Sequence, residues 1–118
     1  MTTADVNTVM QIETSVYPFP WTKAIFADCL RVGYDCWVAT DNEQIIGHGV
    51  ISIGAGESHV LNIAITPGYQ GQGIGRQLLT HLMNIARIKS AEMMLLEVRP
   101  SNKAAIHIYE SIGFNEIG

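Results

Sequence analysis

The sequence predicts a mixed α/β fold, in which one sheet of antiparallel and parallel strands is covered by helices. Three strand-like segments joined by short turns occupy residues 36–66, which is the pattern of consecutive hairpins. A strand–helix–strand crossover follows, and such a connection places its two strands parallel. With 118 residues, of which 47% are hydrophobic and 15% charged, the chain is expected to form a single domain over residues 1–118.

Two helices are expected before the first strand. Apolar residues at helical spacing predict a helix over about residues 4–15, and Pro18 and Pro20 then prevent its continuation. Thr22 is a suitable N-cap for a second helix, which Gly33 is expected to end. The residues at helical spacing in the first helix are Val6, Val9, Met10, Glu13 and Val16.

The three strand-like segments alternate with turn residues. The segments cover residues 36–40, 44–53 and 59–66, and the turns cover 41–43 and 54–58. Gly47 and Gly49 interrupt the second segment. Glycine inside a strand indicates a bulge or a close neighbour.

The second half of the chain predicts two helices and one strand. An amphipathic stretch predicts a helix from Arg76 to about residue 89, and the apolar run 93–98 predicts a buried strand. Ser101 or Asn102 is expected to cap the last helix, and Gly113 is expected to end it.

The most informative segment is the run QGQGIG at residues 70–75, between the third strand and the following helix. Its glycines leave main-chain N–H groups unobstructed at a helix N-terminus, an arrangement that binds phosphate. The run is not a P-loop, because no Lys-Ser/Thr pair follows Gly75, and Arg76 replaces the third glycine of a dinucleotide fingerprint. A strand-to-helix turn without a ligand is the alternative interpretation.

Several further segments accompany this loop. They are the apolar strand at 60–65, Leu96-Glu97-Val98-Arg99, Asn102, Tyr109-Glu110-Ser111-Ile112-Gly113-Phe114 and Tyr17-Pro18-Phe19-Pro20-Trp21. With Gln-x-x-Gly-x-Gly at 70–75, they make nearly the whole chain resemble the GNAT family of N-acetyltransferases. Glu97, Asn102 and Tyr109 resemble the branch of that family that acetylates protein N-termini. The resemblance implies the acyl-CoA N-acyltransferase fold and acetyl-CoA as cosubstrate.

The resemblance also implies which residues hold the cosubstrate. Main-chain groups of Ile63, Ala64 and Ile65 are expected to bind the pantetheine arm as an added strand would, while the isoleucine side chains pack in the core. Asn102 is expected to cap the last helix, to contact coenzyme A, or both. The residues assigned to the pyrophosphate are Gly71, Gln72, Gly73, Ile74, Gly75 and Arg76. The Arg76 side chain either adds charge there or lies solvated at the surface.

Glu97 is the candidate general base, because it interrupts an apolar run in which a carboxylate is costly without a purpose or a partner. Burial would raise its pKa from about 4.3 towards the range of a working base. Such a base suits an α-amine, whose reference pKa is about 7.8, better than a lysine at about 10.4. The alternative is an ion pair with Arg99, two residues along the same face of the strand.

Tyr109 is the candidate donor to the coenzyme A sulfur. A thiol with a pKa of about 8.5 is a stronger acid than tyrosine at about 10, so full proton transfer would be uphill by about 2 kcal/mol. We therefore expect Tyr109 to donate a hydrogen bond to developing negative charge. The alternative is an ordinary core tyrosine on the inner side of the last helix.

The resemblance implies the α-amine of a protein N-terminus as acceptor, with the alanine of a ribosomal protein as the default. A small amine or a lysine is the alternative acceptor, and an acyl-CoA-binding or interaction module with impaired catalysis is the alternative of another class. Members of the family usually continue past the residues matching Gly113 and Phe114 into a hairpin that completes the sheet. We therefore expect a C-terminally truncated domain, either a monomer or a strand-swapped dimer.

Composition excludes several other classes. The net charge of −4 argues against nucleic acid as a direct partner, and it either suits an amine-bearing partner or merely aids solubility. No stretch reaches the ~18 apolar residues of a membrane span, and the polar N-terminus does not read as a signal peptide, so a cytoplasmic protein is expected. Cys29 and Cys36 are expected to be free and buried, and the scattered histidines predict no metal site.

Overall fold

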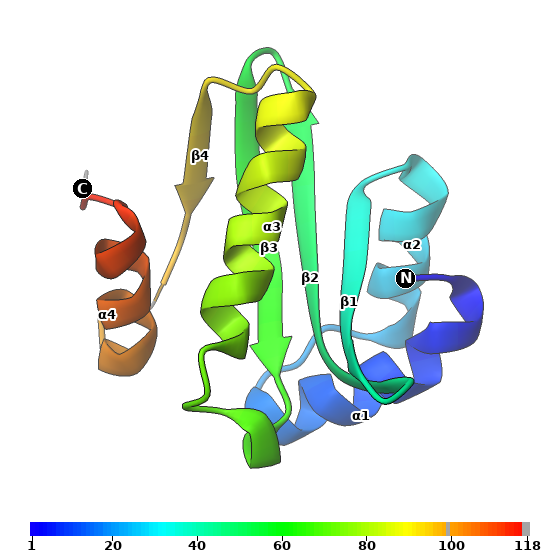
Figure 1. The fold of residues 1–118 in the computed structure, drawn as a ribbon. Helices are drawn as coiled ribbons and strands as arrows, with labels where there is room; N and C mark the ends of the chain where they lie inside the picture. Colours follow the sequence, from blue (N-terminus) through cyan, green and yellow to red (C-terminus); the bar gives the residue numbers. More distant parts are fainter. Residues whose placement is uncertain (99, 117–118) are drawn as a thin grey trace.

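The computed structural model describes residues 1–98 and 100–116, in which a sheet lies between helices (Figure 1). In chain order the elements are η1 (Thr3–Asp5), α1 (Val6–Val16), α2 (Lys23–Val32), β1 (Asp35–Asp41), β2 (Gln44–Gly54), β3 (Glu57–Ile65), η2 (Pro67–Tyr69), α3 (Ile74–Ile88), β4 (Met93–Leu96) and α4 (Lys103–Ile112). None of the helices in these two ranges is long and apolar enough to span a bilayer.

The sheet has the order β1-β2-β3-β4. Its first three strands pair antiparallel as two consecutive hairpins, whereas β4 returns through α3 and pairs parallel to β3. The mixed α/β fold predicted from the sequence is therefore confirmed.

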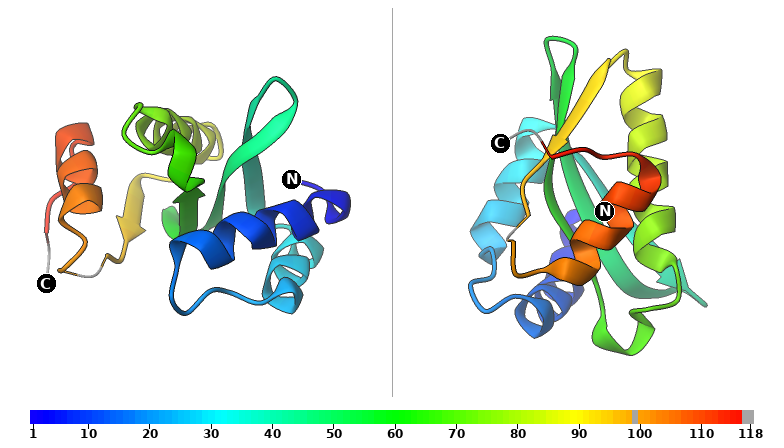
Figure 2. Two further views of the ribbon diagram at one scale, coloured as in Figure 1. Left: turned by 90° about the horizontal axis from the view of Figure 1, so that it is seen from below. Right: turned by 90° about the vertical axis from the view of Figure 1, so that its left-hand side faces the viewer.

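Two hydrophobic clusters fill the two sides of the sheet. Figure 2 shows α1 and α2 on one side and α3 on the other, with α4 beyond β4 at the edge. The cluster under α1 and α2 contains Val6, Val9, Phe26, Cys29, Cys36 and Val50. The cluster under α3 contains Ile51, Leu78, Leu82 and Ala86. Both cysteines are free and buried, as expected.

Local caps set the helix ends much as the sequence predicts. The Thr22 hydroxyl accepts a hydrogen bond from the Ile25 N–H at the start of α2, and the Asn102 side chain accepts one from the Ala105 N–H at the start of α4. Gly33 and Gly113 end these helices in the left-handed conformation. The first helix differs, because a 3-10 turn precedes it and α1 begins at Val6.

Both glycines inside β2 meet close neighbours, as predicted. A Cβ on Gly47 would come 2.6 Å from Ile65 Cδ1, and one on Gly49 would come 2.8 Å from Leu82 Cδ1. The register of β2 also shifts twice, once opposite each neighbouring strand. Glycine at these positions lets α3 and β3 lie close against β2.

Several predicted boundaries are wrong, and β3 begins at Glu57 instead of residue 59. The helix after the glycine loop begins at Ile74, two residues earlier than expected. The last strand ends at Leu96, because its ladder with β3 covers only Glu57–Val60 against Met93–Leu96. Beyond the Val60–Leu96 pair the two parallel strands diverge (Figure 1).

Candidate active site

The divergence of β3 and β4 creates the candidate site. From Asn62 to Ile65, β3 pairs with β2 on one side but has no ladder with β4 on the other. This unpaired edge lies at the carboxyl ends of two parallel strands joined by α3. That is the position at which open α/β sheets bind their ligands.

The glycine loop opens onto the N-terminus of α3. Gly71 and Gly73 have φ angles of 79° and 83°, a region that side-chain-bearing residues rarely adopt. A Cβ at either position would meet nothing within 4 Å, so the loop faces open space. Gly73 is the N-cap residue of α3, and no side chain caps this helix. The first N–H groups of α3 are therefore available to an anion.

The polar side chains of this loop make contacts of their own. The Arg76 guanidinium donates to the Ser111 hydroxyl across 2.7 Å, which links the first turn of α3 to α4. Gln72 Nε2 lies 3.4 Å from the Gly68 carbonyl oxygen. Both side chains are exposed, so neither blocks the loop N–H groups from solvent.

The unpaired edge of β3 presents main-chain groups of alternate residues. The Thr66 N–H donates to the Ile46 carbonyl across 2.8 Å, so the main chain of Thr66 faces β2. Strand geometry gives Ala64 the same orientation and turns Ile63 and Ile65 towards the unpaired edge. The side chains of Ile63 and Ile65 pack against the cluster under α3, as expected.

Tyr17 reaches this edge from the other side of the sheet. It directly follows α1, and its hydroxyl donates a hydrogen bond to the Ile63 carbonyl. Burial, followed by the nearby Tyr109 and Glu13, raises the pKa of Tyr17 to about 12. Tyr17 is therefore a protonated donor at neutral pH, and it lies within electrostatic range of Tyr109. In the sequence, Tyr17 stands out only as part of the segment 17–21.

Glu97 directly follows the last residue of β4, and its side chain is exposed. The expected burial within a strand is therefore wrong, because the β3–β4 ladder ends one residue earlier. Arg99, the partner in the alternative ion pair, lies outside the described residues. The side chain of Glu97 is therefore open to water.

Tyr109 is half-buried on α4, with its ring centroid 6.1 Å from that of Phe114. Burial raises the pKa of its phenol above the ordinary value. The position on the inner side of α4 agrees with the sequence analysis. A phenol that keeps its proton can donate a hydrogen bond to developing negative charge.

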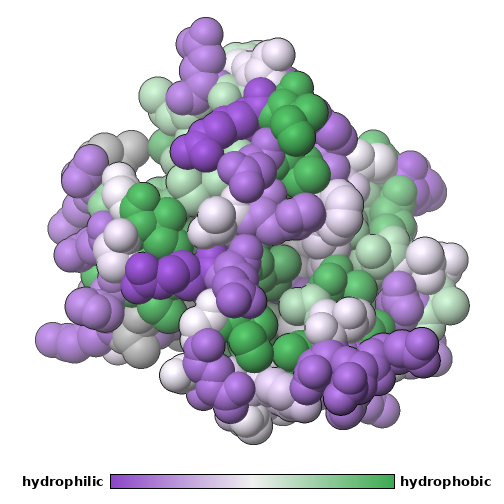
Figure 3. Space-filling view, in the orientation of Figure 1, coloured by the Kyte–Doolittle hydropathy of each residue, from purple (hydrophilic) through white to green (hydrophobic). Residues whose placement is uncertain are grey.

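A cleft of about 1100 Å³ between β4 and α4 is lined by both Glu97 and Tyr109. Leu96, Ile106 and Phe114 are among its apolar lining residues. Figure 3 shows hydrophobic atoms at the surface on the α4 side of this face and again near its middle. Both catalytic candidates therefore line one cleft, whereas the glycine loop and residues 61–65 of β3 do not line it.

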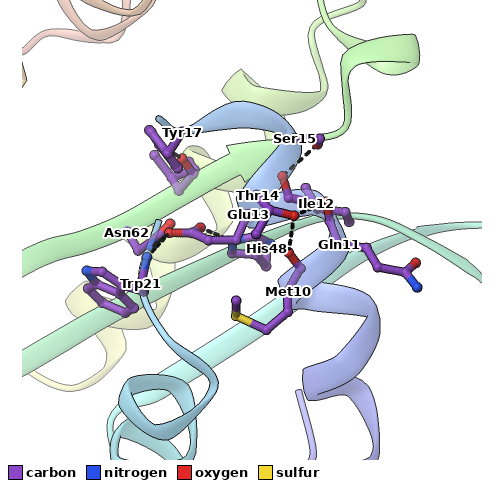
Figure 4. Close-up of polar contacts among 11 residues, drawn as sticks. Met10, Gln11, Ile12, Glu13, Thr14, Ser15, Tyr17, Trp21, His48 and Asn62 are labelled. Atoms are coloured by element: carbon purple, nitrogen blue, oxygen red, sulfur yellow. Dashed lines mark hydrogen bonds and ion pairs between the residues drawn. The ribbon is translucent and has the colours of Figure 1, made fainter. Parts of the chain in front are cut away.

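A buried polar network was not predicted from the sequence. The Glu13 carboxylate accepts hydrogen bonds from the Trp21 N–H and from Asn62 Nδ2, each across 3.0 Å, and lies 3.0 Å from His48 Nε2 (Figure 4). These contacts join α1, the segment 17–21, β2 and β3 behind the candidate site. Available signals were a charged residue within the apolar stripe of α1 and a histidine within an apolar strand.

Among the described residues, no three His, Cys, Asp or Glu side chains gather in a way that could hold a metal ion. At the glycine loop, the N-terminus of α3 has no side-chain cap. The fold and site thus combine a glycine loop at an uncapped helix N-terminus, a strand edge without a neighbouring strand, a carboxylate and a tyrosine.

This combination agrees with a family model that matches residues 6–114, the acetyltransferase (GNAT) family. The chain belongs to the acetyltransferase (GNAT) family.

The similar proteins include enzymes that modify a ribosomal protein. The chain is 38% identical to the [ribosomal protein bS18]-alanine N-acetyltransferase of Escherichia coli K12 over 114 residues, which is 97% of this chain and 77% of that protein. It is 35% identical to the enzyme of the same name from Haemophilus influenzae, over 96% of this chain and 77% of that protein.

Solved structures show the same similarity. The crystal structure of the Escherichia coli ribosomal-protein-S18-alanine N-acetyltransferase superposes with a TM-score of 0.93 and 36% identity, covering 100% of this chain and 76% of that one. An N-acetyltransferase of Thermoplasma acidophilum, solved in complex with coenzyme A, has a TM-score of 0.87 at 18% identity, over 98% of this chain and 86% of that one. The second similarity extends to the fold alone.

Proposed function

We propose that this chain is an acetyl-CoA-dependent N-acetyltransferase that acts on the α-amine of a protein N-terminus. The observation that carries the proposal is the uncapped N-terminus of α3 beside the unpaired edge of β3, in a chain of the GNAT family. The N-terminal alanine of a ribosomal protein is the proposed acceptor, as in the similar enzyme of Escherichia coli. An acceptor of this kind places the reaction in the cytoplasm.

The pyrophosphate of acetyl-CoA binds the N–H groups of residues 71–76, where the partial positive charge of α3 favours it. The pantetheine arm lies along β3 and uses the outward main-chain groups of Ile63 and Ile65. Ala64 contributes packing here, because its main chain faces β2. Asn102 caps α4 and lies in sequence between Pro100 and Ile106, which line the cleft, and its side chain contacts coenzyme A there.

The thioester is thereby directed towards the ends of β3 and β4, where Glu97 and Tyr109 line one cleft. The amine nitrogen attacks the thioester carbonyl, a C–N bond forms and the C–S bond breaks. The proton lost from the amine passes to the Glu97 carboxylate, directly or through water. The departing sulfur accepts a hydrogen bond from Tyr109 and leaves as the thiolate or, after protonation, as the thiol. These steps need no metal ion.

An α-amine suits this arrangement better than a lysine. Its reference pKa of about 7.8 leaves a substantial neutral fraction near neutral pH, whereas lysine at about 10.4 leaves very little.

A comparison of three acceptors, each tested separately, tests the proposal. Acetyl-CoA is incubated with the protein and one of three acceptors, and release of free thiol is followed. The acceptors are a peptide with a free N-terminal alanine, the same peptide with a blocked N-terminus and an internal lysine, and a small diamine. Turnover only with the free alanine supports the proposal. Turnover with the lysine peptide or the diamine alone would reassign the acceptor.

A further inference from the structure

Both outward carbonyls of the unpaired β3 edge are already engaged in the free protein. The Tyr17 hydroxyl donates to the Ile63 carbonyl, and Gln70 Nε2 donates to the Ile65 carbonyl across 2.9 Å. The two donors come from distant parts of the chain, one directly after α1 and one at the start of the glycine loop. Side chains therefore satisfy these strand-edge acceptors in place of a neighbouring strand.

A pantetheine arm competes for the same two atoms. The arm contains two secondary amides, each with one N–H donor and one carbonyl acceptor. Adding such a chain to a strand edge pairs its N–H groups with edge carbonyls and its carbonyls with edge N–H groups. On the β3 edge, the acceptors for those N–H groups are the carbonyls that Tyr17 and Gln70 occupy.

We propose that Tyr17 and Gln70 are displaceable caps on the cosubstrate-binding edge of β3, which the amide groups of pantetheine remove as acetyl-CoA binds. The inference rests on the proposed function. It assigns to Tyr17 a positioning role, because the Tyr17 hydroxyl attaches the segment 17–21 to the edge of β3. The other end of that segment stays anchored, since the Trp21 N–H is bound by the buried Glu13 carboxylate. Displacement of Tyr17 is thus confined to residues 17–20.

The caps have opposite effects on the free and the bound protein. In the free protein each cap stabilises the fold by one hydrogen bond. In the bound protein the pantetheine has replaced that bond, so the cap contributes nothing. Removing a cap must therefore weaken the free fold and tighten cosubstrate binding by the same factor, whereas a merely structural residue would weaken both.

Isothermal titration with coenzyme A measures the binding half of this prediction. Tyr17→Phe keeps the ring but removes the donor, and Gln70→Met keeps the length of the side chain but removes its amide. Each variant is expected to bind coenzyme A about 2- to 10-fold more tightly than the original chain, which is the range of one net hydrogen bond. The matched control is Tyr34→Phe, an exposed tyrosine after α2, which should bind with unchanged affinity.

Urea unfolding with and without coenzyme A measures the other half. Without the ligand, Tyr17→Phe should lower the unfolding midpoint. With saturating coenzyme A, the midpoints of the variant and the original chain should coincide. Unchanged or weaker coenzyme A binding by Tyr17→Phe would overturn the inference while leaving the proposed function intact. Failure of the original chain itself to bind coenzyme A would overturn both.

Discussion

The carboxylate of Glu13 lies 3.0 Å from Nε2 of His48, and both side chains are almost fully buried. Because an ionised carboxylate only accepts hydrogen bonds, His48 Nε2 carries the hydrogen in this contact. The second carboxylate oxygen binds the Trp21 N–H and the Asn62 side chain. Glu13 thus holds the segment that carries Tyr17 against the two strands behind the candidate site.

Removing this carboxylate should destabilise the protein strongly. Glu13→Ala leaves the buried polar groups of His48 and Asn62 without their partner, and breaking a buried pair in this way costs about 3–5 kcal/mol. Chemical unfolding at neutral pH measures the change. The exposed Glu92→Ala is the control and should change stability by less than about 0.5 kcal/mol. A similar small change in Glu13→Ala would contradict the structural role.

The same network predicts acid sensitivity. Burial alone would raise the pKa of Glu13, but hydrogen bonds from His48, the Trp21 N–H and Asn62 outweigh it and lower the pKa below its ordinary value. Such a group contributes stability that is complete above its unfolded pKa, about 4.3, and is lost as pH falls through the lower folded value. The stability difference between the original chain and Glu13→Gln should therefore shrink between about pH 6 and about pH 3. If the stability difference between the two proteins instead grew as the pH falls, the lowered pKa of Glu13 would be contradicted.

The general-base role predicts a selective loss of turnover. Glu97→Gln keeps the size of the side chain but cannot take a proton, so kcat should fall about 10²- to 10⁴-fold. The affinity for coenzyme A should stay the same, because the pyrophosphate and pantetheine contacts lie elsewhere. Thiol release and calorimetry measure the two quantities. Glu92→Gln is the control, since Glu92 lines the same cleft and is exposed. If Glu97→Gln retains full turnover, another group accepts the proton.

Tyr109 distinguishes a catalytic donor from a packing residue. Tyr109→Phe keeps the contact with Phe114 but removes the hydroxyl, so kcat should fall about 10- to 100-fold through lost stabilisation of the leaving sulfur. The melting temperature should change little. A variant that melts much earlier, with unchanged turnover per folded molecule, would indicate that Tyr109 only packs.

The glycine loop offers a matched pair of substitutions. Gly73 and Gly33 have nearly the same φ, 83° and 84°, and a Cβ at either meets nothing within 4 Å. Alanine therefore costs about the same 1–2 kcal/mol of backbone strain at both. Gly73→Ala should also disturb the phosphate-binding N–H groups and weaken coenzyme A binding by about 10-fold or more, whereas Gly33→Ala should leave the affinity unchanged. Equal affinities in the two variants would place the pyrophosphate elsewhere.

Features set by neighbouring residues were predictable from the sequence. Thr22, Gly33, Asn102 and Gly113 act within one turn of their own helix, so their positions alone indicate the helix ends. The glycine loop was equally predictable from the sequence, because its conformation depends on glycines at 71 and 73 and on the helix that follows.

Features set by distant pairings were not predictable. Glu97 was expected in a buried strand, but β4 ends at Leu96, where it separates from β3. No residue near Glu97 in the sequence indicates that separation. The contacts of Glu13 with His48 and Asn62 join residues 35 and 49 positions apart. The contact between Tyr17 and the Ile63 carbonyl joins residues 46 positions apart and depends on which edge of β3 is left unpaired.

A crystal structure of this chain with coenzyme A tests the central claim most directly. The pyrophosphate oxygens should lie within hydrogen-bond distance of the N–H groups of residues 71–76, with the sulfur between the diverging ends of β3 and β4. Coenzyme A bound instead within the cleft between β4 and α4, away from the glycine loop, would contradict the account.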